Sequence, residues 1–313
     1  MKHLLVVTLF LFSLFLLITV EMEQSYKTNE ITSQQDALEL ALAEASTENR
    51  TVIIAMVNKA YVEGDDKSML DLFLKSFWLG ENTRDLIHHL LLVNVDQASY
   101  DRCKFLRLHC YRLETDGVRF DREEVYMSSE FVKMMWRRTL FLGEVLKRGY
   151  SFIFTEPFQR LSFNENIDLQ ISTDRFDGDQ WSQRNPLNTG FYMIRSNNKT
   201  VQLFDLWYSR REDSIGQKEQ DVLDGMLHGE VLKNLDLRVR FLNTLYFSGF
   251  CQDSKDIRAV TTVHANCCRT MSAKVADLSA VLDSWKRFKR SAANETSTFG
   301  NLRHAACAHS WGK

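Results

Sequence analysis

The stretch GYSFIFTEPFQRL, residues 149–161, begins like a buried β-strand. The mostly apolar residues at 150–154 follow a glycine and include two phenylalanines and an isoleucine. A strand of this kind in an α/β sheet presents functional groups at its carboxyl end. Here the strand reaches Thr155 and Glu156 and then continues directly into Pro157. The segments around it therefore decide whether this edge of a sheet carries a site.

Strand-like and helix-like stretches alternate on both sides of this strand. Continuous apolar runs predict strands covered on both faces, and they occur in TVIIAMVN (51–58), LLLVNVD (90–96), IDLQIST (167–173), TGFYMIRS (189–196) and RVRFLN (238–243). Helical periodicity occurs at 69–83, 127–149, 200–211 and 218–230. In the longest of these, Ser128 or Ser129 can cap the start and Gly149 can close the end. The alternation predicts an α/β fold, a mostly parallel sheet flanked by helices.

Length and charge set the broad class of protein. The chain has 313 residues, of which 44% are hydrophobic, enough for one large α/β domain or two small ones. Its formal net charge is -2, so no excess of basic residues points to a nucleic-acid partner.

The N-terminal segment predicts a membrane anchor. Seventeen apolar or small residues, LLVVTLFLFSLFLLITV at 4–20, follow Lys2; a helix needs about 17–25 residues to span a bilayer, and the positive flank predicts a cytoplasmic N-terminus. We therefore expect a signal anchor at 1–20, a stem at 21–48, a lumenal domain at 49–290 and a C-terminal tail at 291–313. The alternative is a cleaved signal peptide and a secreted protein.

Sequons and cysteines agree with a lumenal body. N-x-S/T patterns occur at Asn49, Asn198 and Asn294, and we expect glycosylation there. The six cysteines are candidates for disulfides in an oxidising lumen. If 103–110 is one helix, its two cysteines are roughly 10 Å apart and need other partners or remain free.

The order and spacing of several segments resemble one known family. These segments are TVIIAMVNKAY, CKFLRLHCYRL, MMWRRTLFLGEVLKRGYSFIFT, PFQRLSFN, NPLNTGFYMIRSNNKTVQLFDLW, EQDVL and FCQDSKDIRAVTTVHANCCR. From about residue 51 to 285 the chain is similar to the plant nucleotide-diphospho-sugar transferases of glycosyltransferase family 77. The resemblance implies a GT-A (Rossmann-like) fold and a retaining Golgi enzyme. Such an enzyme transfers a sugar from a nucleotide sugar to a glycan or glycoprotein acceptor, here expected to belong to the plant cell wall.

The sequence departs from the family after the strand at 150–154. The family pattern continues there with an Asp-x-Asp motif, whose carboxylates hold Mn²⁺ or Mg²⁺ against the donor diphosphate. Here roughly eight residues of that pattern are absent, and Glu156 is the one acid left. The alternatives are a catalytically inactive paralogue that binds or scaffolds active transferases, and an incomplete gene model. A literal Asp177-Gly178-Asp179 occurs later, and we interpret it as a structural or acceptor-facing loop.

The resemblance assigns substrate contacts to several other positions. Asn58 and Tyr61 should lie beside the base and ribose. One of the adjacent Arg137 and Arg138 should reach the diphosphate, and we assign this contact to Arg137. The LNTG segment should bind sugar hydroxyls through Asn188, Thr189 and Gly190. For each position the alternative is an ordinary loop, turn or surface residue.

The remaining candidates are catalytic residues and metal ligands. By resemblance, Gln220 and Asp221 should approach the donor sugar; alternatively, they are acids and amides that favour a helix start. By resemblance, His264 is the expected metal ligand, with Glu156 as the second; alternatively, His264 is a structural residue. Zinc held by His264 and the following adjacent cysteines is disfavoured, because their spacing does not match zinc sites.

Overall fold

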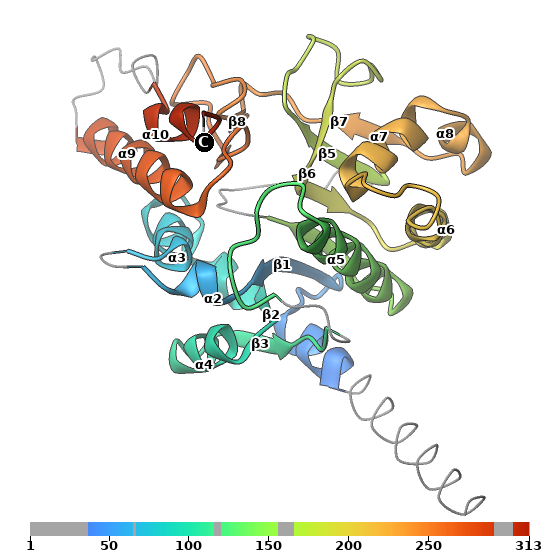
Figure 1. Ribbon diagram of the computed structural model, residues 1–313, viewed down its shortest axis with the longest axis horizontal. Coiled ribbons are helices and arrows are strands. Elements are labelled where there is room, and N and C mark those ends of the chain that lie inside the picture. The colour runs from blue at the N-terminus through green and yellow to red at the C-terminus, as the bar shows by residue number, and fades with distance from the viewer. Residues whose placement is uncertain (1–36, 65–66, 116–119, 156–165, 291–302, 313) are drawn as a thin grey trace, which may run out of the picture.

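The structure, a computed structural model, describes residues 37–64, 67–115, 120–155, 166–290 and 303–312. These residues form a seven-stranded sheet in the order β3-β2-β1-β4-β6-β5-β7 (Figure 1). The strands are β1 (Thr51–Val57), β2 (Leu90–Asn94), β3 (His109–Arg112), β4 (Ser151–Phe154), β5 (Leu169–Thr173), β6 (Leu187–Ile194) and β7 (Val239–Phe241). A second, two-stranded sheet contains β8 (Phe247–Gly249) and β9 (Thr262–His264).

The large sheet is mostly parallel, as the sequence predicts. β1 pairs in parallel with β2 and β4, β2 with β3, and β5 with β7. β6 is the exception, because it runs antiparallel to both β4 and β5. The order reverses beside β1: β2 and β3 extend the sheet to one side, and β4 extends it to the other. Such a switch point opens a crevice at the carboxyl ends of the strands.

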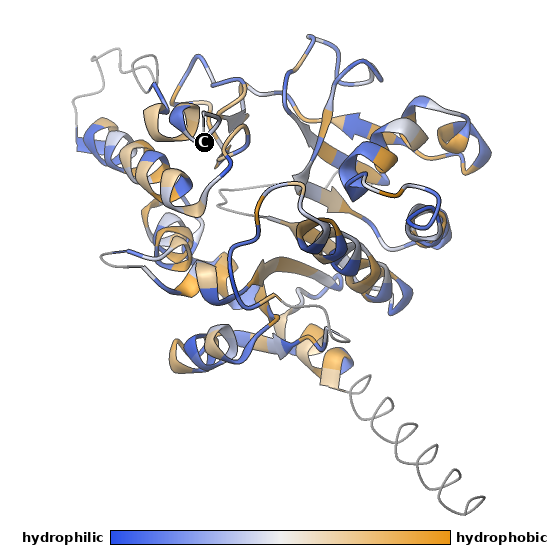
Figure 2. Ribbon diagram, in the orientation of Figure 1, coloured by the Kyte–Doolittle hydropathy of each residue, from blue (hydrophilic) through white to orange (hydrophobic). Residues whose placement is uncertain are grey.

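Helices cover both faces of the sheet, so the central strands β1 and β2 are apolar and buried on both sides. The helices are one at 37–45, α2 (Lys59–Val62), α3 (Met69–Leu79), η1 (Arg84–His89), α4 (Gln97–Phe105), α5 (Ser129–Lys147), α6 (Asn198–Ser209), α7 (Glu219–His228), α8 (Val231–Asn234), α9 (Met271–Arg290) and α10 (Ala305–His309). Val52 and Ile54 of β1 pack in one core with α5 and α6, and Ile53 packs in the opposite core with α3. Figure 2 accordingly shows β1 in the hydrophobic colour.

The predicted caps of the longest helix are both present. Ser128 is the N-cap of α5, and its Oγ accepts a hydrogen bond from the Phe131 N–H. Gly149 follows the helix with a φ of 77°, which glycine adopts without strain.

Two segments that the sequence analysis placed outside the transferase domain pack against its body. Leu38 and Leu42, in the predicted stem, lie in the main core with β1 and α5. In the predicted tail, Cys307 of α10 is buried and disulfide-bonded to Cys268. Apolar burial at one end and a covalent bond at the other therefore extend the folded body to residues 37 and 312.

The cysteines form three disulfides, Cys103–Cys110, Cys251–Cys267 and Cys268–Cys307. The expectation that Cys103 and Cys110 are too far apart is wrong. It rested on one continuous helix, whereas α4 ends at Phe105 and the chain turns back into β3. The reversal brings the two Cα atoms to 6.0 Å. Because Cys267 and Cys268 each bond another cysteine, neither is available to zinc beside His264.

The predicted anchor at 1–20 lies outside the described residues, as do Glu156 and Asn294. Within the described part of the chain, no helix has both the length and the apolar character that crossing a membrane requires. The other two sequon asparagines, Asn49 and Asn198, are exposed.

Burial raises the pKa of the Tyr192 phenol in β6 far above its usual range. The unfolded chain loses this proton near pH 10, whereas the folded chain retains it. Above that pH the unfolded state therefore binds fewer protons, and the free energy of unfolding falls by about 1.4 kcal/mol per pH unit for this group. Urea unfolding of Tyr192→Phe above pH 10 should show a shallower loss of stability than the wild type. The matched control is Tyr246→Phe, at an exposed tyrosine. Equal slopes in all three proteins would contradict the assignment.

Candidate active site

A cleft of about 290 Å³ opens at the carboxyl end of β1. Segments distant in the sequence line it: the start of α2, the α5 face, the start of β6, the start of α7, the loop after β9, and Trp311 near the C-terminus. A narrower, mostly apolar cavity of about 90 Å³ adjoins it beneath Asn58 and Tyr61 and reaches Thr155 at the end of β4. The two spaces together occupy the crevice that the switch point between β1 and β4 predicts.

Asn58 and Tyr61, predicted to lie beside the base and ribose, both line the cleft. Asn58 is buried, and its Nδ2 donates to the Arg122 carbonyl at 3.0 Å. The Asn58 Oδ1 has no hydrogen-bond partner among the described residues. The short helix α2 is held by the Lys59 N–H, which donates to Asp96 Oδ2 at 2.5 Å. Asn58 therefore presents a fixed acceptor atom, and a buried acceptor is most stable with a donor in place.

A buried ion pair crosses the floor of the cleft. Arg138 Nη2 of α5 lies 2.5 Å from Glu219 Oε1 of α7, and the Glu219 residue is 1% exposed. The Thr189 hydroxyl of β6 lies 2.8 Å from the same Glu219 oxygen. Gln220 Oε1 accepts from the Thr189 N–H at 3.1 Å. The network thus joins three elements, and it leaves the Gln220 Nε2 group as a donor for a ligand.

Of the two adjacent arginines, Arg138 lines the cleft and Arg137 does not. The Arg137 Nη2 instead donates to the Glu114 carbonyl at 2.7 Å, and Glu114 does not line the cleft. Adjacent residues on a helix point about 100° apart, so only one of the two can face the site. The sequence analysis assigned Arg137 to the site and therefore missed Arg138 and its partner Glu219, both of which line the cleft.

The start of β6 lies in close contact with His264. Asn188 Nδ2 donates to Asp174 Oδ1 at 2.8 Å, and Asn188 Oδ1 accepts from the Gly190 N–H at 2.8 Å. Asn266 Nδ2 donates to the same Asp174 oxygen at 2.9 Å. A Cβ atom on Gly190 would lie 2.5 Å from His264 Nε2. Gly190 is therefore required so that the imidazole can lie against the β6 backbone, and Asn188 positions this strand.

The described residues do not supply a complete metal site. No group of three or more His, Cys, Asp or Glu side chains among them is arranged to hold a metal ion. His264 lies in the cleft, but its predicted companion, Glu156, is outside the described residues. Among the described residues, His264 is therefore the one predicted metal ligand that can be placed in the cleft.

Two other acidic candidates lie away from the cleft. Asp221 is exposed, 3.7 Å from Lys218 Nζ, and partial burial raises its pKa despite this partner. In the Asp177-Gly178-Asp179 loop, the Asp177 carboxylate accepts from the Ser182 hydroxyl at 2.6 Å and from the Asp179 N–H at 2.9 Å. These bonds lower the pKa of Asp177 and support the interpretation of a structural loop.

Comparison with known proteins agrees with this geometry. A family model described as nucleotide-diphospho-sugar transferase matches residues 85–278. One uncharacterized protein of Arabidopsis thaliana is 50% identical over 303 residues, covering 92% of this chain and 89% of the relative. A second uncharacterized Arabidopsis protein is 41% identical over 258 residues, covering 82% of this chain and 69% of the relative.

We expect Gly190→Ala to displace His264, because the added Cβ occupies the position of the imidazole. Gly225→Ala is the matched control: Gly225 lies in α7, and nothing lies within 4 Å of an added Cβ. The control should stabilise the fold by about 0.5–1 kcal/mol through helix propensity, while Gly190→Ala should destabilise it by about 1–3 kcal/mol. Urea unfolding and the NMR shift of the His264 ring protons measure both effects. An unchanged His264 signal in Gly190→Ala would refute the contact.

Arg138→Met should destabilise the fold by about 3–5 kcal/mol, because it leaves the Glu219 carboxylate buried without its cation. Adding Glu219→Gln to that variant should recover part of the loss, since the stranded charge is then removed. The control Arg137→Met removes the bond to the Glu114 carbonyl but leaves the buried Arg138–Glu219 pair intact, so it should cost less. Urea unfolding of the four proteins tests this, and equal losses for the two single arginine variants would exclude a special role for the buried pair.

Proposed function

The chain belongs to the nucleotide-diphospho-sugar transferase family, and we propose that its cleft binds a nucleotide-diphosphate sugar for transfer to a glycan or glycoprotein acceptor. The observation that carries the proposal is the position of the cleft. It lies at the carboxyl ends of β1 and β4, where the strand order reverses. In open α/β sheets, nucleotides bind at this position.

The residues around the crevice match the chemistry of such a donor. The Asn58 Oδ1 is a buried acceptor suited to an N–H of the base or a ribose hydroxyl. Arg138 provides a guanidinium at the floor, and a guanidinium matches phosphate oxygens. Across the cleft, the Gln220 amide is positioned by Thr189 to donate to a sugar hydroxyl. We propose that Asn188 acts by holding this strand start in place.

The Golgi lumen and a cell-wall acceptor are part of the proposal. Three disulfides among the described residues suit an oxidising compartment. Two exposed sequon asparagines suit passage through the same secretory compartment.

A second candidate function is a nucleotide-binding partner of active transferases. It is favoured by the sequence after β4, where Glu156 stands in place of the paired aspartates of the family, because a transferase of this family is expected to need the cation at the diphosphate.

Calorimetry with UDP and GDP tests donor binding directly. One nucleotide should bind the full chain, and Asn58→Ala should weaken it by about 1 kcal/mol, roughly fivefold, through the loss of one hydrogen bond. Asn234→Ala, which removes an exposed amide at the end of α8 and outside the cleft, should not change the affinity. If neither nucleotide binds, or if both variants weaken binding equally, the proposed donor site is wrong.

Repeating the titration with Mn²⁺ and with a chelator separates the two candidate functions. For a binding partner, nucleotide affinity should change little with Mn²⁺, and donor hydrolysis should be absent. A strong dependence on Mn²⁺ that His264→Ala abolishes, together with donor hydrolysis, would identify an active transferase.

A further inference from the structure

We propose that Trp311 is a stacking platform for a sugar ring of the acceptor, at the end of the cleft away from the strand ends. This inference rests on the proposed transferase-family function and adds to it a place for the acceptor. Trp311 lines the cleft and is 48% exposed. It belongs to the last described segment of the chain, which packs on α9 rather than on the large sheet.

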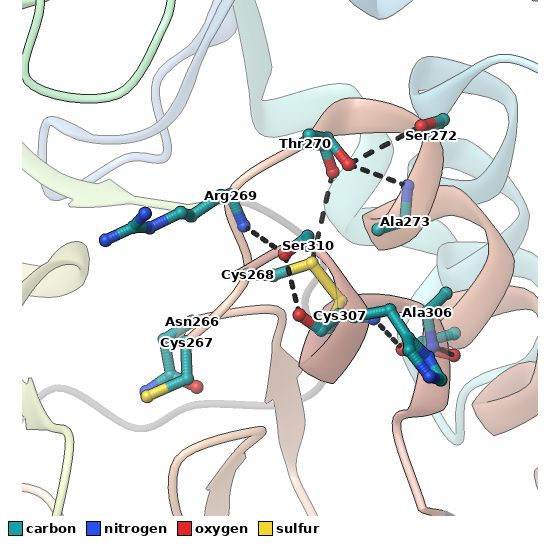
Figure 3. Close-up of a disulfide and its surroundings, with 12 residues drawn as sticks. Asn266, Cys267, Cys268, Arg269, Thr270, Ser272, Ala273, Ala306, Cys307 and Ser310 are labelled. Atoms are coloured by element: carbon teal, nitrogen blue, oxygen red, sulfur yellow. Dashed lines mark hydrogen bonds between the residues drawn. A yellow bond between two sulfur atoms is a disulfide. The ribbon is translucent and has the colours of Figure 1, made fainter. Parts of the chain in front are cut away.

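The indole of Trp311 is held in one orientation. Its Nε1 donates to the Cys267 carbonyl at 2.8 Å. The Arg269 guanidinium lies over the ring, 4.1 Å from its centroid. The Arg269 N–H donates to the Ser310 hydroxyl at 3.0 Å, next to Trp311 in the chain (Figure 3). An aromatic ring that is already fixed loses little entropy when a ligand stacks on it.

A covalent bond anchors the segment that carries this ring. Cys307 is bonded to Cys268, as Figure 3 shows. The two Cα atoms lie 4.6 Å apart. The Cys307 N–H also donates to the buried Asp277 of α9 at 2.8 Å. Since Cys268 itself lines the cleft, the disulfide places the C-terminal segment directly at the cleft wall.

The exposed part of Trp311 suits a sugar ring better than a polar group. Its one hydrogen-bond donor is already used by the Cys267 carbonyl, so the ring offers the ligand its π-face and its apolar area. A π-face carries partial negative charge, and it attracts the slightly positive C–H groups on one face of a pyranose or furanose ring.

A second aromatic ring and two cations continue this part of the cleft. Arg269 also lies 5.7 Å from the Tyr126 ring centroid, and Lys218 Nζ donates to the Tyr126 hydroxyl at 3.2 Å. The Arg269 guanidinium has no acidic partner among the described residues. Arg269 is thus shared between the two rings, and a sugar that stacks on Trp311 uses the ring face opposite Arg269.

The nucleotide base is the competing occupant of this surface. The base and ribose have a separate place, because the cavity beneath Asn58 and Tyr61 adjoins the strand ends at the switch point. Trp311 does not line that cavity. We therefore assign Trp311 to the acceptor side of the cleft.

The test is calorimetric titration of the full chain, saturated with its nucleotide, with neutral tetrasaccharides of glucose, galactose, xylose and arabinose. Trp311→Ala should weaken at least one of them about tenfold, and Trp311→Phe should retain most of the affinity because it keeps a ring. Trp78→Ala is the matched control: Trp78 is 54% exposed, lies under Arg84, and is outside the cleft. Thermal unfolding of each variant verifies its fold.

The outcomes separate this inference from the proposed function. If a nucleotide binds but no tetrasaccharide depends on Trp311, the acceptor platform is wrong and the donor site stands. If Trp311→Ala weakens the nucleotide as strongly as a tetrasaccharide, the ring belongs to the donor and the inference is overturned. If no nucleotide binds, the titration is run without it, and a Trp311-dependent tetrasaccharide then supports the platform while the donor proposal fails.

Discussion

The buried pair of Arg138 and Glu219 is the interaction on which the shape of the cleft depends. A carboxylate that is 1% exposed needs a cation and hydrogen bonds, because an isolated charge in the interior is very costly. Arg138 meets this need from α5, and it also lies over the Phe154 ring at the end of β4. Thr189 adds a hydrogen bond from β6. One arginine therefore fixes the relative positions of α5, α7 and the strand ends that surround the ligand space.

The antiparallel strand β6 explains why its first residues belong to the site. A parallel strand contributes its carboxyl end to the crevice, as β1 and β4 do. Because β6 runs the opposite way, with Phe154 paired to Tyr192, its start reaches the edge where β4 ends. Asn188, Thr189 and Gly190 consequently face the same space as Asn58. The sequence predicted these residues through the family resemblance, since an apolar run does not show the direction of its strand.

Strands and helices that follow from the spacing of apolar residues were predicted from the sequence. Contacts that depend on packing between distant segments were not. The strands at 51–57 and 90–94 and the long helix at 129–147 follow from apolar runs, helical spacing and capping residues. Glu219 illustrates the limit. At the first turn of α7 an acid usually complements the helix dipole, so nothing local shows that it is buried. Its role depends on Arg138, 81 residues earlier in the chain.

The adjacent cysteines 267 and 268 give the cleft wall a rigidity that neither sequence pattern nor apolar packing alone supplies. Neither cysteine is bonded to the other, and each is tied in a different direction: Cys267 to Cys251, and Cys268 to Cys307. The loop between β9 and α9 is thus anchored on both sides immediately after His264. Both links close loops, of 16 and 39 residues, and so restrict the unfolded chain as well as the folded one. A wall constrained in this way can hold His264, Arg269 and Trp311 in place before a ligand arrives, so binding does not have to order them.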